Sequence, residues 1–301
     1  MAILVRRSNL LVRVTDAEAL ASAWQHNADA ITLMLEGAHT GVRDAIAAAA
    51  RGAAEIFVKV NTDSLQADLE SAVWPGLRGI MLDGVESATE VRAADERMAA
   101  FEVERGLAKG SLQLIVVLGS AAGVWDVRAL VSASPRISQV FLDEVALAEN
   151  LAITPSPELD PFVYARGRVV VEAIAAKVMP VGIAYPLSVH TDAISRDEVH
   201  ALATNGKNLG LKGVICPHPA WVEPVNAAFT PTPELVGYNQ RVREAFAAGV
   251  AAGTAAVPLD GRMIDVPVDE WAIVVLETAQ ACAKRDAEKR AAVSQLPAKQ
   301  T

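Results

Sequence analysis

The sequence predicts an α/β fold, a (β/α)8 TIM barrel that is followed by a C-terminal helical extension. Eight short runs of β-branched residues and leucine recur along the chain, and segments with helical periodicity separate them. Near-continuous apolar runs of this kind are typical of strands that are buried on both faces of a parallel sheet. Eight such strands alternating with helices favour a closed parallel barrel.

The expected strands can be placed in chain order. They are residues 10–14, 30–35, 55–60, 79–82, 112–118, 139–142, 180–185 and 213–216. The clearest helical segments between them are alanine-rich and comprise residues 16–25, 41–50, 87–104 and 195–209. The alternative architecture is an open doubly wound sheet, which usually carries a glycine-rich phosphate turn after its first strand. Arg13-Val-Thr-Asp16 stands there instead, so the closed barrel is preferred.

The end of the chain departs from this alternation. Residues 239–252 are expected to be helical, residues 253–258 break that helix, and residues 265–290 resume it. We therefore divide the chain into a barrel (1–235), a helical extension (236–292) that packs on the barrel or on a neighbouring subunit, and a disordered tail (293–301). The tail is polar, and chain termini of this kind are usually poorly ordered.

Composition restricts the class of protein. Of 301 residues 52% are hydrophobic and 21% are charged, which provides a sizeable core. The net charge of -9 argues against a nucleic-acid partner, since phosphate binding needs a basic surface.

Cys216 and Cys282 stand far apart and match no disulfide or zinc spacing. No apolar run reaches the roughly 18 residues of a spanning helix, and Arg6 and Arg7 follow the N-terminal apolar residues, the reverse of a signal peptide. A cytoplasmic protein without a membrane partner is expected.

Polar side chains stand where the expected strands end. In a parallel barrel the loops after the strands carry the chemistry. The residues in question are Arg13, Glu36, Lys59, Asn61, Asp83, Gly119-Ser120, Asp143, Glu144, Tyr185 and His218. Acids that face Arg13 and Lys59 suit an anionic substrate, with or without a bound metal. The alternative is structural: Asp143 and Glu144 would only cap the next helix, and Asp83, which precedes Gly84, would lie in a turn.

Several stretches resemble one known family. They are Lys212-Gly-Val-Ile-Cys-Pro-His-Pro219, residues 225–234, Asp260-Gly-Arg-Met-Ile-Asp-Val-Pro267, Arg6-Arg-Ser-Asn-Leu10 and Tyr164-Ala-Arg166. In order and spacing they are similar to the citrate lyase β-subunit-like family of the HpcH/HpaI aldolase/citrate lyase superfamily, over roughly residues 6–278. The resemblance implies a barrel, a homotrimer and reversible carbon–carbon cleavage of a 3-hydroxyacyl thioester.

The resemblance also implies roles for particular positions. In that family a divalent metal (Mg2+ or Mn2+) held by two carboxylates binds the oxo-acid fragment and stabilises the enolate. An arginine pairs with the substrate carboxylate, and Lys59 stands at that position here. Acids near the second strand assist, and of these only Glu36 remains. The aspartate that matches Asp265 reaches an active site, often that of the next subunit.

Both metal-ligand positions of the family differ in this chain. The glutamate after strand five is replaced by Gly119, which cannot ligate through a side chain. The aspartate after strand six falls on Val145 in the simplest register, or on Glu144 or Asp143 after a shift of one or two residues. The histidine of the family's Ile-His-Pro is Cys216. Asp83, in contrast, adds a carboxylate where the family has none.

Three interpretations of the function stay open. The first is a carbon–carbon lyase or aldolase with a rebuilt site that acts on an acyl-CoA thioester or a small hydroxy/oxo acid. Its residues are Asp265, Glu36 and Lys59 for catalysis, Arg13, Asn61, Ser120 and His218 for substrate binding, and Asp83, Asp143 and Glu144 for the metal. The second is a non-catalytic paralogue that binds acyl-CoA or oxo acid, and the third is a structural subunit of a lyase complex. We favour the first because several replacements are charged or polar.

Overall fold

A computed structural model describes residues 4–37, 39–154, 159–182 and 194–295. The chain forms two compact units, one of residues 6–229 with 292–301 and one of residues 230–291 with 1–5. Each unit is described by itself. Among the described residues, no helix combines the length and the apolar character that crossing a membrane requires.

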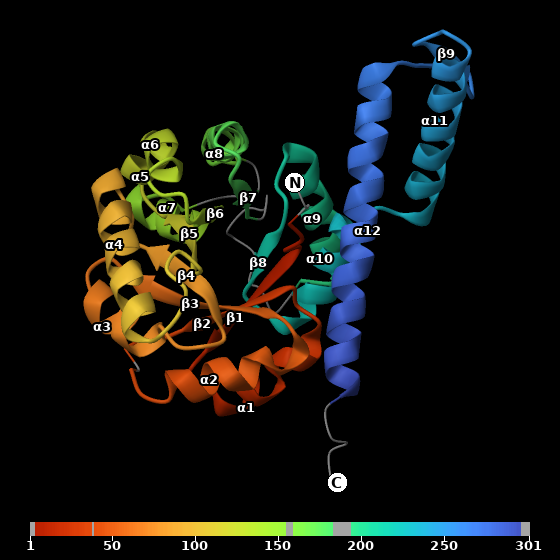
Figure 1. Ribbon diagram of the computed structural model, residues 1–301. Helices are drawn as coiled ribbons and strands as arrows, with labels where there is room; N and C mark the ends of the chain where they lie inside the picture. The colour runs from red at the N-terminus through yellow and green to blue at the C-terminus, as the bar shows by residue number, and fades with distance from the viewer. Residues whose placement is uncertain (1–3, 38, 155–158, 183–193, 296–301) are drawn as a thin grey trace. The chain divides into compact units, whose positions relative to one another are not determined.

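The larger unit is a barrel of eight parallel strands ringed by helices (Figure 1). The strands are β1 Ser8–Arg13, β2 Ala30–Met34, β3 Glu55–Asn61, β4 Leu77–Asp83, β5 Gln113–Leu118, β6 Ile137–Leu142, β7 Met179–Val181 and β8 Val214–Cys216. Each pairs in parallel with its chain neighbour from β1 to β7, and β1 also pairs with β8.

The ring closes between β7 and β8 through backbone hydrogen bonds. The N–H of Gly182 donates to the carbonyl of Gly213 (3.1 Å), and the N–H of Lys212 donates to that of Pro180 (2.9 Å). The predicted (β/α)8 barrel is therefore confirmed, and the open sheet is excluded. All eight expected strands are present, although residues 183–185 of the seventh lie outside the described part of the chain.

Two separate apolar clusters explain the near-continuous hydrophobic runs. Phe57 and Met81 belong to a small cluster inside the barrel, whereas Val58 and Ile80 belong to the large cluster between strands and helices. Because side chains alternate along a strand, a strand that is buried on both faces must be apolar at successive positions.

The helices of this unit follow the strands in the expected order. They are α1 Ala17–Ser22, α2 Val42–Ala49, α3 Leu65–Ala72, α4 Ala88–Glu104, α5 Ala121–Trp125, α6 Val127–Val131, α7 Glu144–Asn150, α8 Val163–Ala175, α9 Arg196–Leu209 and α10 Val222–Phe229. Capping side chains fix the first residues of several helices. Ser87 and Ser195 each form a capping box, with Glu90 and Glu198, at the start of α4 and α9. The four helical segments expected from the sequence are confirmed.

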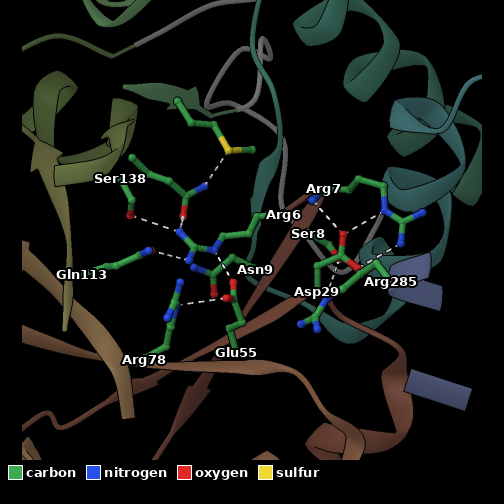
Figure 2. Close-up of polar contacts among 12 residues, drawn as sticks. Arg6, Arg7, Ser8, Asn9, Asp29, Glu55, Arg78, Gln113, Ser138 and Arg285 are labelled. Atoms are coloured by element: carbon green, nitrogen blue, oxygen red, sulfur yellow. Dashed lines mark hydrogen bonds and ion pairs between the residues drawn. The ribbon is translucent and has the colours of Figure 1, made fainter. Parts of the chain in front are cut away.

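A buried arginine fills the N-terminal end of the barrel. The guanidinium of Arg6 lies among side chains from the beginnings of three strands, Glu55, Gln113 and Ser138 (Figure 2). It also stacks 4.9 Å from the ring centre of Phe57. Its exposed fraction is 1%. The resembling Arg-Arg-Ser stretch therefore has a structural role here: it fixes the end of the barrel opposite the strand carboxyl termini.

The smaller unit contains two helices and a β-hairpin that was not expected. The helices are α11 Pro233–Ala251 and α12 Val266–Ser294, and the hairpin strands are β9 Val257–Leu259 and β10 Arg262–Ile264. Asp260 and Gly261 form the hairpin turn with positive φ angles of 50° and 75°, as a tight two-residue turn requires. Thr232 caps α11 and Pro233 is its first residue, so this helix begins before residue 239. The tail was expected from residue 293, but α12 ends at Ser294; residues 296–301 lie outside the described part.

Candidate functional site

The carboxyl ends of the first four strands bring polar side chains to one level of the barrel. Arg13 is the register partner of Met34, Met34 is the partner of Lys59, and Lys59 is the partner of Met81. Lys59 lies two residues beyond Phe57, which packs inside the barrel, so both side chains face the interior. Asn61 and Asp83 form the register pair two residues further along the strands.

An ion pair between neighbouring strands occupies this mouth. The Lys59 ammonium Nζ lies 2.6 Å from Oδ2 of Asp83, and their side chains are 29% and 23% exposed. The other carboxylate oxygen of Asp83 accepts the N–H of Gly84 at 2.9 Å. Asp83 therefore lies in a turn, which was the structural alternative for this residue, and it also pairs with a basic side chain. The pair has no net charge, and it holds the largely buried Lys59 ammonium in place at the strand ends.

A second, more exposed ion pair lies at the ends of β1 and β2. Arg13 Nε lies 3.0 Å from Oε1 of Glu36, and the two side chains are 62% and 47% exposed. Glu36 has a φ of +47°, a left-handed conformation that is uncommon for a residue other than glycine. Gly37 follows with a φ of +82°, so the two residues form a tight turn beyond the end of β2. Two of the residues proposed from the sequence are thus brought together at the barrel mouth.

The three carboxylates expected to bind a metal have separate partners. Asp83 pairs with Lys59. Asp143 caps α7, accepting the N–H groups of Val145 and Ala146 at 3.1 Å each, which confirms the structural alternative for this residue. Glu144 is buried and its two oxygens accept from Arg166 of α8. Within the described ranges no three His, Cys, Asp or Glu side chains are grouped so that they could hold a metal ion. These residues do not fit a divalent cation.

The position after β5 is sterically closed to a ligating side chain. A Cβ atom added to Gly119 would lie 2.8 Å from the Cβ of Ala146 in α7, closer than such atoms approach in folded proteins. Val145, the other family ligand position in the simplest register, is apolar and 56% exposed. Neither position therefore supplies a carboxylate to the mouth.

Glu144 and Arg166 form the most buried ion pair beside the mouth. The side chains are 7% and 6% exposed, and Arg166 also contacts Asp160. Burial raises the pKa of the Glu144 carboxyl to about 7, against the hydrogen bonds from Arg166, which lower it. The sequence drew attention to Arg166 through the Tyr-Ala-Arg stretch, but its partner depends on how α8 packs, and no local pattern predicts that.

The remaining candidates make local hydrogen bonds. Ser120 caps α5 by accepting the N–H of Gly123 at 3.1 Å. His218 Nδ1 accepts the N–H of Ala220 at 3.2 Å, and Asn61 Oδ1 accepts that of Asp63 at 3.1 Å. Cys216 is fully buried, and burial raises the pKa of its thiol, so it stays protonated. Tyr185 lies outside the described residues.

Asp265 belongs to the smaller unit. It directly precedes α12, and its Oδ1 accepts the N–H of Val268 at 3.3 Å. Because the two units are described separately, its role in an active site stays a prediction. Sequence reasoning also did not identify Arg43, Trp74 and Arg105, which lie together on the outside of the barrel.

Comparisons with known proteins agree with this architecture. A family model described as HpcH/HpaI aldolase/citrate lyase matches residues 7–219. Citrate lyase subunit beta of Haemophilus influenzae is 27% identical over 295 residues, covering 92% of this chain and 97% of that protein. A citrate lyase subunit beta-like protein of Deinococcus radiodurans is 30% identical over 235 residues, 77% of each chain.

Solved structures share the fold at lower sequence identity. CitE from Mycobacterium tuberculosis, solved in complex with magnesium, acetoacetate and coenzyme A, superposes with a TM-score of 0.67. The two chains are 20% identical, and the match covers 92% of this chain and 98% of that one. At this identity the likeness establishes the barrel and says nothing of the site.

Proposed function

Because the chain belongs to the HpcH/HpaI aldolase/citrate lyase family, we propose that it is a carbon–carbon lyase acting on an acyl-CoA thioester or a small hydroxy/oxo acid. The observation that carries this proposal is the Lys59–Asp83 ion pair at the strand ends, with Arg13 and Glu36 beside it. Charged groups retained at the barrel mouth are what an anionic substrate needs.

The named relatives support the substrate class. The H. influenzae relative is a citrate lyase subunit, and the M. tuberculosis structure contains acetoacetate and coenzyme A beside magnesium. An oxo acid and a thioester are the two fragments that cleavage of a 3-hydroxyacyl thioester releases. We therefore assign the oxo-acid fragment to the mouth of this barrel.

The chemistry requires one base and a fixed positive charge. As the carbon–carbon bond breaks, the hydroxyl proton passes to a base, the oxo acid forms, and the bonding electron pair remains on the acyl fragment as an enolate. In this proposal Glu36 accepts the proton, Arg13 holds the substrate carboxylate, and the Lys59 ammonium stabilises negative charge on oxygen. A preorganised cation lowers the barrier because the charge develops only in the transition state.

No step of the proposed reaction uses a metal ion. Asp83, Asp143 and Glu144 are engaged with Lys59, a helix terminus and Arg166, and Gly119 cannot ligate. Lys59 therefore provides the charge that magnesium provides when it is bound in relatives. A lysine is a point charge without the fork of an arginine, so it suits an oxyanion as well as a carboxylate.

Asp265 is proposed as the acid that returns a proton to the enolate, supplied by a neighbouring subunit of a trimer. Its place in the Asp260-Gly-Arg-Met-Ile-Asp265 stretch is the basis for this role. Mixing an Asp265→Asn variant with a Glu36→Gln variant should restore part of the activity through mixed oligomers. Verified subunit exchange without restored activity would contradict a shared site.

Thermal melts of the purified protein test the proposal. Pyruvate, oxaloacetate, acetoacetate and acetyl-CoA are added singly and in pairs, each with and without Mg2+ or Mn2+. A ligand at 100 times its dissociation constant stabilises a protein by about 2.7 kcal/mol. We expect stabilisation by an oxo acid in the absence of metal and loss of this effect in Lys59→Met. No shift with any oxo acid would contradict the proposal.

A non-catalytic binding protein is the second candidate, and Gly119 favours it because the family ligand is absent at that position. It predicts the same thermal shifts but no product. Chromatography that measures oxo-acid release from a thioester distinguishes the two functions, because only the lyase releases product.

A further inference from the structure

A pocket on the outside of the barrel combines cationic and aromatic side chains. None of these side chains has a role in the proposed lyase chemistry. The pocket has a volume of about 440 Å³, within the range of small-molecule sites, roughly 300–1,000 Å³. Helices α2 and α3 and the residue after α4 form it, and its lining includes His39, Arg43, Glu70, Ser71, Trp74 and Arg105.

Trp74 is the fixed centre of this pocket. Its indole Nε1 donates to the carbonyl of Ser71 at 2.8 Å, which locks the ring at the end of α3. Two guanidinium carbons lie over the ring, that of Arg105 at 4.0 Å and that of Arg43 at 5.1 Å from its centre. Cation–π stacking holds both groups in place, and two arginines converge on one surface.

The two arginines keep hydrogen-bond donors available. Arg105 donates from Nη2 to the Glu70 carbonyl at 3.3 Å, and its buried Nε lies 3.4 Å from Oε1 of Glu104, an ion pair that leaves the Nε–H without a well-aligned hydrogen bond. Arg43 is exposed, and no described carboxylate lies within ion-pair distance of it. An arginine stacked on an aromatic ring presents its N–H groups edge-on, in the geometry that phosphate oxygens accept.

Glu70 lines the pocket, and Asp68 contacts the lining residue His39, so the engagement of both acids bears on the ligand. Asp68 is already engaged, since its oxygens meet the Asn61 N–H, the Ser64 hydroxyl and His39 Nε2 at 2.6–2.9 Å. Glu70 is exposed, and its carboxylate is free to accept from hydroxyl groups. The pocket therefore suits an anion that also carries hydroxyl groups.

We propose that this pocket binds a phosphate monoester, with the phosphate on Arg43 and Arg105 and the hydroxyl-bearing part toward Glu70. The phosphate group has two sources, a free phosphorylated polyol or the 3′-phosphate of coenzyme A. The first is independent of the proposed lyase function, whereas the second rests on it. Binding therefore tests the pocket, and turnover tests the active site.

Isothermal titration of the full-length protein at pH 8 tests the proposal, with glycerol 3-phosphate and inorganic phosphate as probes. We expect saturable binding of glycerol 3-phosphate, tighter than that of inorganic phosphate. Arg43→Gln should weaken it by about tenfold or more, because a charge-assisted hydrogen bond is lost. Arg51→Gln is the matched control: this exposed arginine follows α2, does not line the pocket, and should leave the affinity unchanged.

Coenzyme A and 3′-dephospho-coenzyme A distinguish the two sources. If the ligand is coenzyme A, loss of its 3′-phosphate and the Arg43→Gln substitution should weaken binding by similar factors. The two changes together should then weaken binding no more than either change alone. If both forms bind equally and Arg43→Gln affects glycerol 3-phosphate alone, the ligand is a free phosphate ester. Absence of saturable binding by every phosphate probe, or equal affinities of wild type and Arg43→Gln, would overturn the proposal. Arg43 is exposed, so its variant is expected to fold, which a thermal melt verifies.

Discussion

The Lys59 ammonium lies 2.6 Å from the Asp83 carboxylate at the carboxyl ends of two adjacent strands. Both side chains are about three-quarters buried, so their interaction is screened less than that of a surface pair. The arrangement fixes the Lys59 ammonium at the barrel mouth, where the family resemblance implies an arginine and a metal. It is the central feature of the proposed site.

Replacing Lys59 should remove oxo-acid binding. Lys59→Met leaves the Asp83 carboxylate half-buried without its partner, and the negative charge then repels an anionic ligand. We expect the thermal shift with an oxo acid to disappear, whereas Lys59→Arg should keep part of it. Lys109→Met is the control, because Lys109 is exposed in a loop before β5. Equal shifts in Lys59→Met and wild type would exclude Lys59 from the site.

Restoring a carboxylate after β5 should not create a metal site. In Gly119→Glu the new Cβ meets Ala146 at 2.8 Å, and overpacking of this kind typically costs about 1–3 kcal/mol. We expect a lower Tm and no stabilisation by Mg2+. The control is Gly119→Ala combined with Ala146→Gly, which should recover stability relative to Gly119→Ala alone. Independent, additive effects of the two changes would show that the contact does not limit position 119.

The free energy of unfolding should depend on pH through Glu144. Its pKa in the folded protein is about 7, above the ordinary value of 4.5. The folded state therefore binds the proton more tightly than the unfolded chain, and the resulting stability is present below pH 4.5 and is lost as pH rises to about 7. At about 1.4 kcal/mol per pKa unit the loss is on the order of 3 kcal/mol.

Urea unfolding of wild type and Glu144→Gln between pH 4.5 and 8 measures this effect. Glutamine keeps the shape of the side chain but does not titrate. We expect the stability of wild type relative to the variant to fall up to pH 7 and then to level off. A difference that stays constant with pH would contradict the raised pKa.

Removing the arginine at the N-terminal end of the barrel should reduce stability but not ligand binding. Arg6→Met leaves Gln113 without the guanidinium that it contacts and leaves Glu55 with Arg78 as its ion-pair partner. Because Glu55 keeps one arginine, we expect a loss somewhat below the roughly 3–5 kcal/mol that is typical when a buried ion pair is broken on one side. Urea unfolding should show this loss, while Arg51→Met, a surface change, should stay near wild type. A small effect of Arg6→Met would mean that the barrel end does not depend on this contact.

The sequence predicted the barrel well because its strands are buried on both faces. Phe57 and Val58 belong to different apolar clusters, one inside the barrel and one outside it. The continuous apolar run in β3 therefore reflects burial of both faces of the strand. The hairpin of β9 and β10 was not predicted, since its strands have three residues each and show little burial. Such short elements carry no period that can be counted.

Side-chain contacts in the candidate site were predictable from the sequence mainly where both residues lie at the ends of adjacent strands. Lys59 and Asp83 lie near the carboxyl ends of consecutive paired strands, so their proximity follows from the barrel itself. The capping by Asp143 was also predictable as the structural alternative, because an acid directly after a strand often caps the next helix. The pairing of Glu144 with Arg166, in contrast, depends on the packing of α8. The pocket around Trp74 joins three helical segments that no motif connects.

A turnover assay tests the central claim most directly. Wild type and Lys59→Met are incubated with citryl-, malyl-, citramalyl- and β-methylmalyl-CoA without added metal, and oxo-acid release is followed. We predict release from at least one thioester by wild type, and a loss of about 100-fold or more in Lys59→Met, as for removal of a group that stabilises an oxyanion. Cleavage that persists in Lys59→Met, or that depends entirely on Mg2+, would contradict the account.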